Sequence, residues 1–212
     1  MLYSGGSLMK LFILLWLWIV APLFSDQLFL DKKGESVRIA VARTPAEISV
    51  NEGKRILVTS FMEAYEDVPL VELNPNFKSI GDVRRFYRDY FDSEFAHFQN
   101  GSLIWVQAFI EEKLIGWATF MLEENDHVYM NLLAIDPFYQ NRGIGKHLVF
   151  SICSEELFPH IEAINVLLRK VNLQGQLFYE HIGFRDAPDY LSKDNFVDNS
   201  LLTPIRWKKS EN

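Results

Sequence analysis

The chain has 212 residues, a formal net charge of −7 and a hydrophobic content of 49% that includes 17 phenylalanines. This composition predicts a well-packed globule and argues against a disordered chain. The acidic balance argues against a nucleic-acid partner, and no Lys/Arg-rich run is present. Cys153 is the sole cysteine, so an internal disulfide is excluded. Without a leader of about 30 residues the chain keeps roughly 175, a normal size for one domain with its own core.

The N-terminal segment is hydrophobic. Residues 11–24 follow Lys10 and carry no charge. As a helix this run would be about 21 Å long, shorter than a bilayer core of about 30 Å. A basic residue followed by a short apolar block is typical of a signal peptide, whereas counting from Leu2 makes the run long enough for an uncleaved anchor. We expect residues 1–30 to be signal-like or an anchor, with packing on the domain as a third alternative, and residues 37–208 to form the folded domain.

The first part of the domain predicts one strand and a helical region. Residues 37–43 alternate between apolar and polar side chains, which indicates a strand. Thr44, Pro45 and Glu47 together are typical of a capped helix start. We expect the helical region to run toward Tyr65 with an interruption near Gly53.

A second helix follows. Ser79 and Asp82 resemble a capping box, with Asp in the place of Glu. Apolar and aromatic side chains then recur at helical spacing from residue 83 to residue 98, and Asn100-Gly101 ends the pattern. We interpret the aromatic stripe as core, or as one wall of an acceptor cleft.

The remaining elements alternate between strands and helices. Residues 103–110 and 114–121 read as a hairpin whose strands are apolar on both faces, which predicts central strands covered by helices. After it we expect strands at 128–135, 163–169 and 201–207, helices at 143–156 and 173–182, and a polar loop at 185–200. Cys153 falls on the first of these helices, and we expect it to be a small buried residue rather than a nucleophile.

A glycine-containing turn joins the strand at 128–135 to the following helix. It reads Gln140-Asn141-Arg142-Gly143-Ile144-Gly145. A turn that opens a helix presents unpaired N–H groups and the positive end of the helix dipole to one point, which suits phosphate oxygens. The spacing does not match a Walker A loop, because Gln140 stands where its first glycine is needed. It does not match a dinucleotide fingerprint either, because Leu148 replaces the third glycine.

The pattern Gln-x-x-Gly-x-Gly resembles the acyl-CoA pyrophosphate loop of the GNAT superfamily of N-acetyltransferases. The segment from Asn172 to Phe184, with Gly175, the Phe178-Tyr179 pair and Gly183-Phe184, is similar to a second GNAT signature, and Leu133-Ala134-Ile135-Asp136-Pro137 is similar to the strand end before the loop. The resemblance implies an α/β (α+β) fold with a mixed, mostly antiparallel central sheet flanked by helices in the order β-α-α-β-β-β-α-β-α-β.

The resemblance also implies a site. The pantetheine arm of acetyl-CoA would pair with the backbone of Leu133 and Ile135, and Asn172 would lie near that arm. Tyr179 would act as general acid toward the departing thiolate. The pyrophosphate would sit on the N–H groups of Gln140, Asn141, Arg142, Gly143, Ile144, Gly145 and Lys146.

The general base is left open by the sequence. Many family members place a carboxylate two residues before the leucine that matches Leu133, and this chain has Asn131 there, which takes no proton. A water chain leading to Glu124, His127 or Tyr129 is the alternative. The histidines show no metal-ligand spacing, so we expect no metal.

Together these observations predict an acyltransferase that moves an acetyl group from acetyl-CoA to an amine-bearing small molecule or peptide by direct transfer. The alternative is a non-catalytic acyl-CoA-binding module, tethered at a membrane through residues 1–25. The acceptor would contact residues 61–72, the helix face at 87–98 and the loop at 185–200. Use of acetyl-CoA favours a cytoplasmic location, while the N-terminal segment favours anchoring or export.

Overall fold

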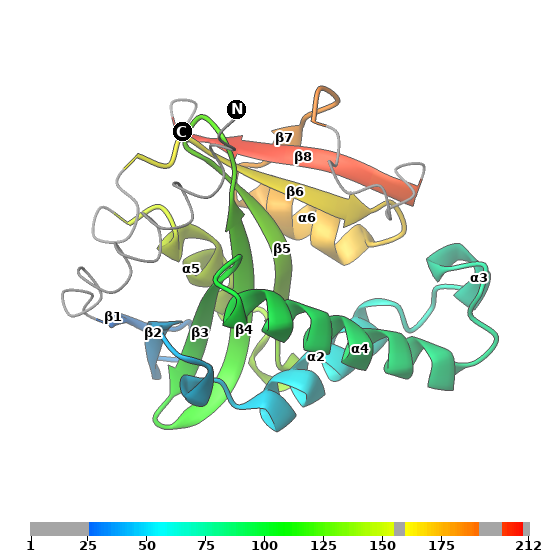
Figure 1. Ribbon diagram of the computed structural model, residues 1–212, viewed down its shortest axis with the longest axis horizontal. Helices are drawn as coiled ribbons and strands as arrows, with labels where there is room; N and C mark the ends of the chain where they lie inside the picture. The colour runs from blue at the N-terminus through cyan, green and yellow to red at the C-terminus, as the bar shows by residue number, and fades with distance from the viewer. Residues whose placement is uncertain (1–25, 155–159, 191–200, 210–212) are drawn as a thin grey trace, which may run out of the picture.

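The computed structural model describes residues 26–154, 160–190 and 201–209. Figure 1 shows one twisted sheet with helices on both of its faces. The predicted N-terminal segment lies outside the described residues up to residue 25, and so does the 191–200 part of the predicted acceptor loop. Among the described helices, none combines the length and the apolar character needed to cross a bilayer.

The sheet has eight strands in the spatial order β1-β2-β3-β4-β5-β6-β8-β7. Every neighbouring pair is antiparallel except β5 and β6. The predicted mixed, mostly antiparallel sheet is therefore confirmed. The strands are β1 (Gln27–Leu30), β2 (Ser36–Ala42), β3 (Ile104–Ile110), β4 (Lys113–Leu122), β5 (His127–Ile135), β6 (Ala163–Arg169), β7 (Arg185–Asp186) and β8 (Leu202–Lys208).

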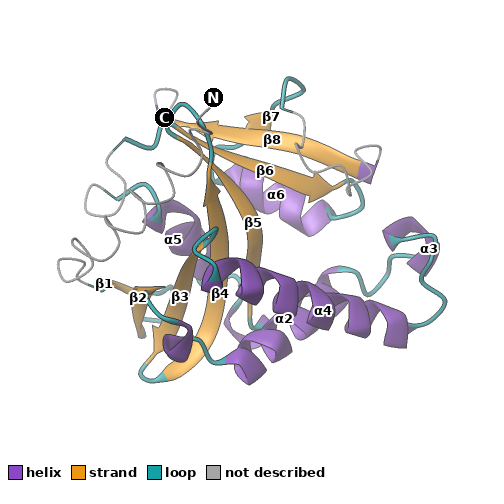
Figure 2. Ribbon diagram, in the orientation of Figure 1, coloured by secondary structure: helices purple, strands orange, loops and turns teal. Residues whose placement is uncertain are grey.

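Helices cover the sheet from both sides, as Figure 2 shows. The long helices α2 and α4 lie on one face, and α5 and α6 lie on the other. The helical elements are η2 (Pro45–Glu47), α2 (Val50–Ala64), α3 (Leu70–Leu73), α4 (Ile80–Gln99), η3 (Pro137–Tyr139), α5 (Ile144–Ser151) and α6 (Leu173–His181).

The core under α2 and α4 is aromatic. Trp105 of β3 and Trp117 of β4 are buried and stack with their ring centroids 4.6 Å apart. Phe91 of α4 meets Trp117 edge-on at 5.4 Å, and the Trp117 Nε1–H donates to the carbonyl of Gly53 at 3.2 Å. The aromatic stripe predicted for α4 is therefore core, as expected of large rings whose polar atoms find partners.

The core on the other face is aliphatic. Leu148, Val149 and Ile152 of the α5 region are fully buried against the sheet. They pack on alternate side chains of the central strands, such as Ala118 and Ile164. The two cores together explain why β3 and β4 read as apolar on both faces.

The structure corrects two predicted boundaries. Gly53 does not interrupt a helix, because α2 runs through it; the break falls before it, at Ile48 and Ser49 between η2 and α2. A Cβ at Gly53 would stand 2.6 Å from the Phe91 ring, so this glycine permits close packing of α2 on α4. The sheet also begins before residue 37: β1 pairs with β2, and its exposed apolar Leu28 and Leu30 made it resemble the end of the leader.

Capping behaves differently at the two predicted helix starts. The Ser79 hydroxyl accepts the Asp82 N–H at 3.2 Å, so the capping pair predicted for α4 is confirmed. Glu47 reaches back to the Arg43 N–H at 3.0 Å, but the turn it closes is the short 3-10 helix η2. Pro45 stands in the first turn, where its missing N–H is not needed, and the chain restarts as α2 after Ser49.

Candidate active site

A gap opens between β5 and β6. The two strands pair at only three positions, and the last of these is Tyr129 with Asn165. Beyond it the strands diverge, as Figure 1 shows, while β5 continues to pair with β4 as far as Ile135. The edge of β5 from Met130 onward, including the half-buried Leu133 and Ile135, therefore faces the gap instead of a neighbouring strand.

The turn after β5 ends in a helix N-terminus. Gly143 is the N-cap of α5 and adopts a left-handed conformation with φ of 90°. No atom lies within 4 Å of the place where its Cβ would stand, so the space in front of the turn is open. The first N–H groups of an α-helix have no partner within the helix. Those of Ile144, Gly145 and Lys146 therefore form a cradle suited to an anion.

Gly145 lets this cradle sit close to the sheet. A Cβ there would stand 3.0 Å from Ile135 Cδ1 and 3.1 Å from the Phe178 ring. The second glycine of the turn thus allows a close approach to Ile135 and Phe178, whereas Gly143 is favoured by its backbone conformation.

The side chain of Arg142 faces away from the cradle. It is 4% exposed and forms ion pairs with Asp31 and Glu35, which lie in the turn between β1 and β2. The Lys32 N–H also donates to the Arg142 carbonyl at 3.2 Å. Burial opposes the ionisation of Asp31, but the N–H groups of Glu35 and Lys33 and the Arg142 guanidinium outweigh it and lower its pKa. The hairpin and the cradle are therefore joined by a buried charge pair.

Other side chains fix the backbone of the turn between β5 and α5. Asp136, at the end of β5, accepts the Phe138 N–H at 3.0 Å and forms an ion pair with Arg55 of α2. The Gln140 amide donates to the Ile135 carbonyl at 3.3 Å. The Gln140 N–H donates to the Pro137 carbonyl at 3.2 Å, so the structure does not leave this predicted donor free for a pyrophosphate. Arg142 can reach a ligand only through its backbone, whereas the side chain of Lys146 is exposed.

Tyr179 is buried on the α6 side of the gap, 6% exposed. Its ring lies between Phe178 and Phe184, with centroid distances of 5.0 and 5.1 Å. Burial raises the pKa of the Tyr179 hydroxyl above its ordinary value, and the nearby hydroxyls of Tyr65 and Tyr129 act in the same direction. At neutral pH the phenol is therefore protonated, as a general acid must be.

Asn172 is engaged in structure. Its side chain accepts the Gly175 N–H at 2.8 Å as the N-cap of α6. A Cβ at Gly175 would overlap this side chain at 2.6 Å, which accounts for the small residue at that place. Burial raises the pKa of Tyr65 to about 12, against the opposing effects of Arg169 and of a hydrogen bond with Asn172. Asn172 thus links the start of α6 to the end of α2.

A buried carboxylate lies where β5 leaves β6. The strand has a bulge at Asn131, because Leu132 pairs with Thr119 and Met130 pairs with Phe120. Asn131 Nδ2 donates to Glu94 of α4 at 3.1 Å, and Thr119 Oγ1 donates to the same carboxylate at 2.6 Å. The Asn131 amide cannot accept a proton, but the carboxylate of Glu94 from α4 lies beside it.

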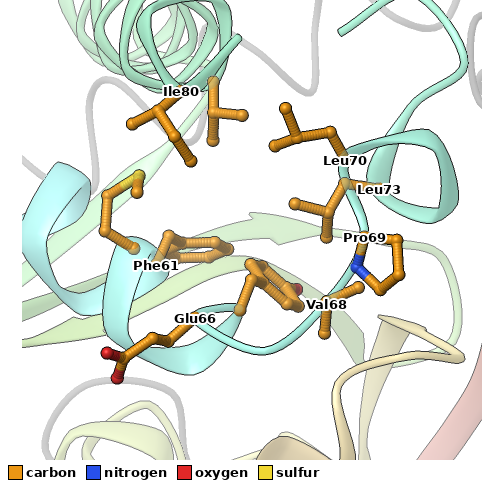
Figure 3. Close-up of a pocket in the computed structure, with 10 residues that line it drawn as sticks. Phe61, Glu66, Val68, Pro69, Leu70, Leu73 and Ile80 are labelled. Carbon is orange, nitrogen blue, oxygen red and sulfur yellow. The ribbon is translucent and has the colours of Figure 1, made fainter. Parts of the chain in front are cut away.

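An apolar cavity of about 340 Å³ opens between α2, α3 and the start of α4. Figure 3 shows Phe61, Leu70, Leu73 and Ile80 around it, with the carboxylate of Glu66 pointing away. Tyr65 lines the cavity and also contacts Asn172, so this side chain stands between the cavity and the gap.

Comparison with known proteins agrees with this geometry. Residues 65–184, more than half of the chain, match the family model described as the Acetyltransferase (GNAT) family. The chain belongs to the GNAT acetyltransferase family. It is therefore an acyltransferase, and the predicted family and enzyme class are confirmed. No curated protein sequence matches the chain.

Solved structures share the fold of this GNAT enzyme. The PaiA N-acetyltransferase from Thermoplasma acidophilum, in complex with coenzyme A, is 16% identical with a TM-score of 0.61, and the match covers 80% of this chain and 98% of that chain. A GNAT-family acetyltransferase from Staphylococcus aureus Mu50 is 15% identical with a TM-score of 0.57, covering 81% and 98%. A Bacillus subtilis acetyltransferase in complex with CoA is 14% identical with a TM-score of 0.51, covering 81% and 98%.

The proposed base partners lie at different distances from the gap. Tyr129 belongs to its last strand pair and neighbours Tyr190, with ring centroids 6.1 Å apart. Glu124 lies in the turn between β4 and β5, and His127 is the first residue of β5, whose N–H donates to the Glu124 carbonyl at 3.4 Å. That turn is at the end of β5 opposite to the cradle, so Tyr129 is the one of the three that faces the candidate site.

Glu94 was missed by sequence reasoning, although a signal was present. It falls on the apolar stripe of α4, three residues after Phe91 and four before Phe98, where a charged side chain is out of place on a buried face. Cys153 is half-buried, and burial raises its pKa to about 12, which suits a packing role. Within the described ranges no group of three His, Cys, Asp or Glu side chains is placed to hold a metal ion.

Proposed function

We propose that this GNAT enzyme is an N-acetyltransferase that moves the acetyl group of acetyl-CoA directly to an amine. The observation that carries the proposal is the divergence of β5 from β6 directly before a helix N-terminus with an open cradle. A strand edge can pair with an extended chain of amides, and a cradle of N–H groups can bind a pyrophosphate. Acetyl-CoA contains both groups, and two of the structural neighbours hold coenzyme A.

In this proposal the amine and the thioester meet in the gap. The ammonium group first loses one proton to water, the neutral nitrogen then forms a bond to the acetyl carbon, and the bond from carbon to sulfur breaks. Tyr179 gives its phenolic proton to the departing sulfur, and the second proton of the nitrogen returns to the phenolate. Its burial between Phe178 and Phe184 supports the role, because it keeps the phenol protonated and excludes water.

Two variants test the two halves of the proposal. Gly143→Glu places a carboxylate in the open space of the cradle, so calorimetric titration should show no CoA binding. Tyr179→Phe removes only the proton donor, so turnover should fall roughly 10- to 1,000-fold with little change in CoA affinity. Retained CoA binding in the first variant rules out the cradle, and unchanged turnover in the second rules out the general acid.

The apolar cavity supports an acceptor that carries a hydrocarbon group. It is lined by Phe61, Leu73, Val83 and other apolar side chains, and Tyr65 lines it on the side that contacts Asn172. Burying one CH₂ group contributes about 0.8 kcal/mol, which is roughly fourfold in affinity. Along a series of primary amines from butylamine to octylamine, KM should therefore fall by up to about fourfold per carbon. A KM that does not change along the series would show that the acceptor does not use this cavity.

A further inference from the structure

Glu94 is a buried carboxylate that forms no ion pair with another described residue. It is 3% exposed, and in the described part of the chain no lysine or arginine forms an ion pair with it. Its partners are the Thr119 hydroxyl and the Asn131 amide, both from the sheet, and His97 on its own helix acts on it electrostatically. Burial raises the pKa of Glu94, while these three groups act in the opposite direction. Buried charges in proteins are normally paired.

Asn131 presents an unused acceptor beside this charge. Its Nδ2–H donates a hydrogen bond to Glu94, which sets the orientation of the amide. Its Oδ1 is buried with no hydrogen-bond partner among the described residues. The residue is the bulged position of β5 and lies two residues beyond the last pair with β6. It is therefore placed where the gap opens, and the bulge turns its side chain toward α4.

We propose that Asn131 and Glu94 form the recognition site for the acceptor, and that the group they recognise is a primary ammonium. This inference rests on the proposed function and names the acceptor class. Asn131 Oδ1 accepts an N–H from the ammonium group, which satisfies the unpaired carbonyl. Glu94 is a positioning residue: it holds the amide in this orientation and supplies the negative charge that the cation balances. Alcohols lack the charge, and carboxylates are repelled by it.

Gln107 is a matched comparison within the same chain. It too is a buried amide whose Oε1 has no partner among the described residues. Its Nε2, however, donates to the Glu47 carbonyl at 3.2 Å, and it lies on β3, which β4 separates from β5 and the gap. If the unpaired acceptor of Asn131 were only a feature of packing, substitutions of Asn131 and Gln107 would have the same effect on acceptor binding.

The first test measures steady-state acetyl transfer by the full chain, with butylamine, octylamine and 2-phenylethylamine as acceptors and released thiol as the signal. Glu94→Gln keeps the shape and loses the charge, and Asn131→Leu keeps the volume and loses the amide. Each should raise KM for the amine roughly 30-fold or more with a smaller change in kcat, as expected when one member of a buried charged contact is removed. Gln107→Met should leave KM unchanged, and CoA affinity should be unchanged in all three.

The second test is a pH profile of kcat/KM for one amine. In the wild type, kcat/KM should rise as Glu94 ionises. Thr119→Val removes a hydrogen bond that favours the ionised form, so this rise should move to higher pH, and in Glu94→Gln it should disappear. A residue that served only the fold would not move this limb of the profile.

Each outcome decides between the claims. Unchanged KM in Glu94→Gln overturns the ammonium site, and so does an equal rise in KM for Asn131→Leu and Gln107→Met. A wild type that binds CoA but acetylates none of the three amines overturns the ammonium site while the cradle stands. A wild type that does not bind CoA overturns the proposed function itself.

Discussion

Removal of one charge should show how strongly the first hairpin supports the cradle. The Asp31 side chain is 0% exposed and that of Arg142 is 4% exposed, so their ion pair is fully buried. Asp31→Asn keeps Oδ1, which accepts the N–H groups of Lys33 and Glu35 at 2.8 and 2.9 Å. It replaces Oδ2, which accepts from the Arg142 guanidinium, by an NH2 group, so both the charge and that hydrogen bond are lost. Breaking a buried pair in this way costs about 3–5 kcal/mol, and because Glu35 still contacts Arg142 we expect about 3 kcal/mol, the lower end.

Part of this cost should appear in ligand binding, because Arg142 belongs to the turn that forms the cradle. A loss of about 1.4 kcal/mol in the ordering of this turn corresponds to roughly tenfold weaker CoA binding. The pKa of Asp31 is lowered in the folded protein, so its contribution is present above the unfolded pKa of about 3.9 and is lost as pH falls through the lower folded value. The difference in stability between wild type and variant should therefore shrink as the medium is acidified below that range.

The assay is urea unfolding at several pH values, together with calorimetric titration of CoA. Glu35→Gln is the control, because its side chain is 51% exposed and a pair of that kind contributes about 0.2–1 kcal/mol. If Asp31→Asn loses no more stability and no more CoA affinity than Glu35→Gln, the buried pair does not support the cradle.

Three further outcomes follow from the same contacts. Gly145→Ala should lose about 1–3 kcal/mol of stability and weaken CoA binding, because its Cβ would stand 3.0 Å from Ile135 Cδ1; an unchanged urea midpoint would mean that α5 yields without cost. A fragment of residues 36–212 should bind CoA more weakly than residues 26–212, since the shorter one lacks the hairpin charge; equal calorimetric affinities would contradict this. Burial raises the pKa of Glu94, so its ionisation disfavours the fold, and the contribution of Glu94 to wild-type stability should fall as pH rises above about 4.3. Glu94→Gln should lack that fall in urea unfolding, and parallel curves would refute the assignment.

The local parts of this site could be predicted from sequence. The glycine turn that opens α5 and the capping pair that begins α4 were predicted, because each depends on a few consecutive residues. The cap formed by Asn172 is equally local, but it was not predicted, since the resemblance assigned that residue to the cofactor. Period and composition likewise predicted the central strands and the aromatic face of α4, since burial repeats along each element. The order of these signals along the chain was enough to indicate the GNAT family.

Contacts between distant residues depended on the tertiary structure. Asp31 meets Arg142 across 111 positions and Glu94 meets Asn131 across 37, and no spacing rule within one element relates either pair. The first pair follows from β1 and β2 folding against the turn before α5, which places a hairpin beside the cradle. The second follows from a bulge, because one extra residue in β5 changes which side chains face α4. Sheet order and register bring these residues together, and both are set by the packing of the whole sheet rather than by any single segment.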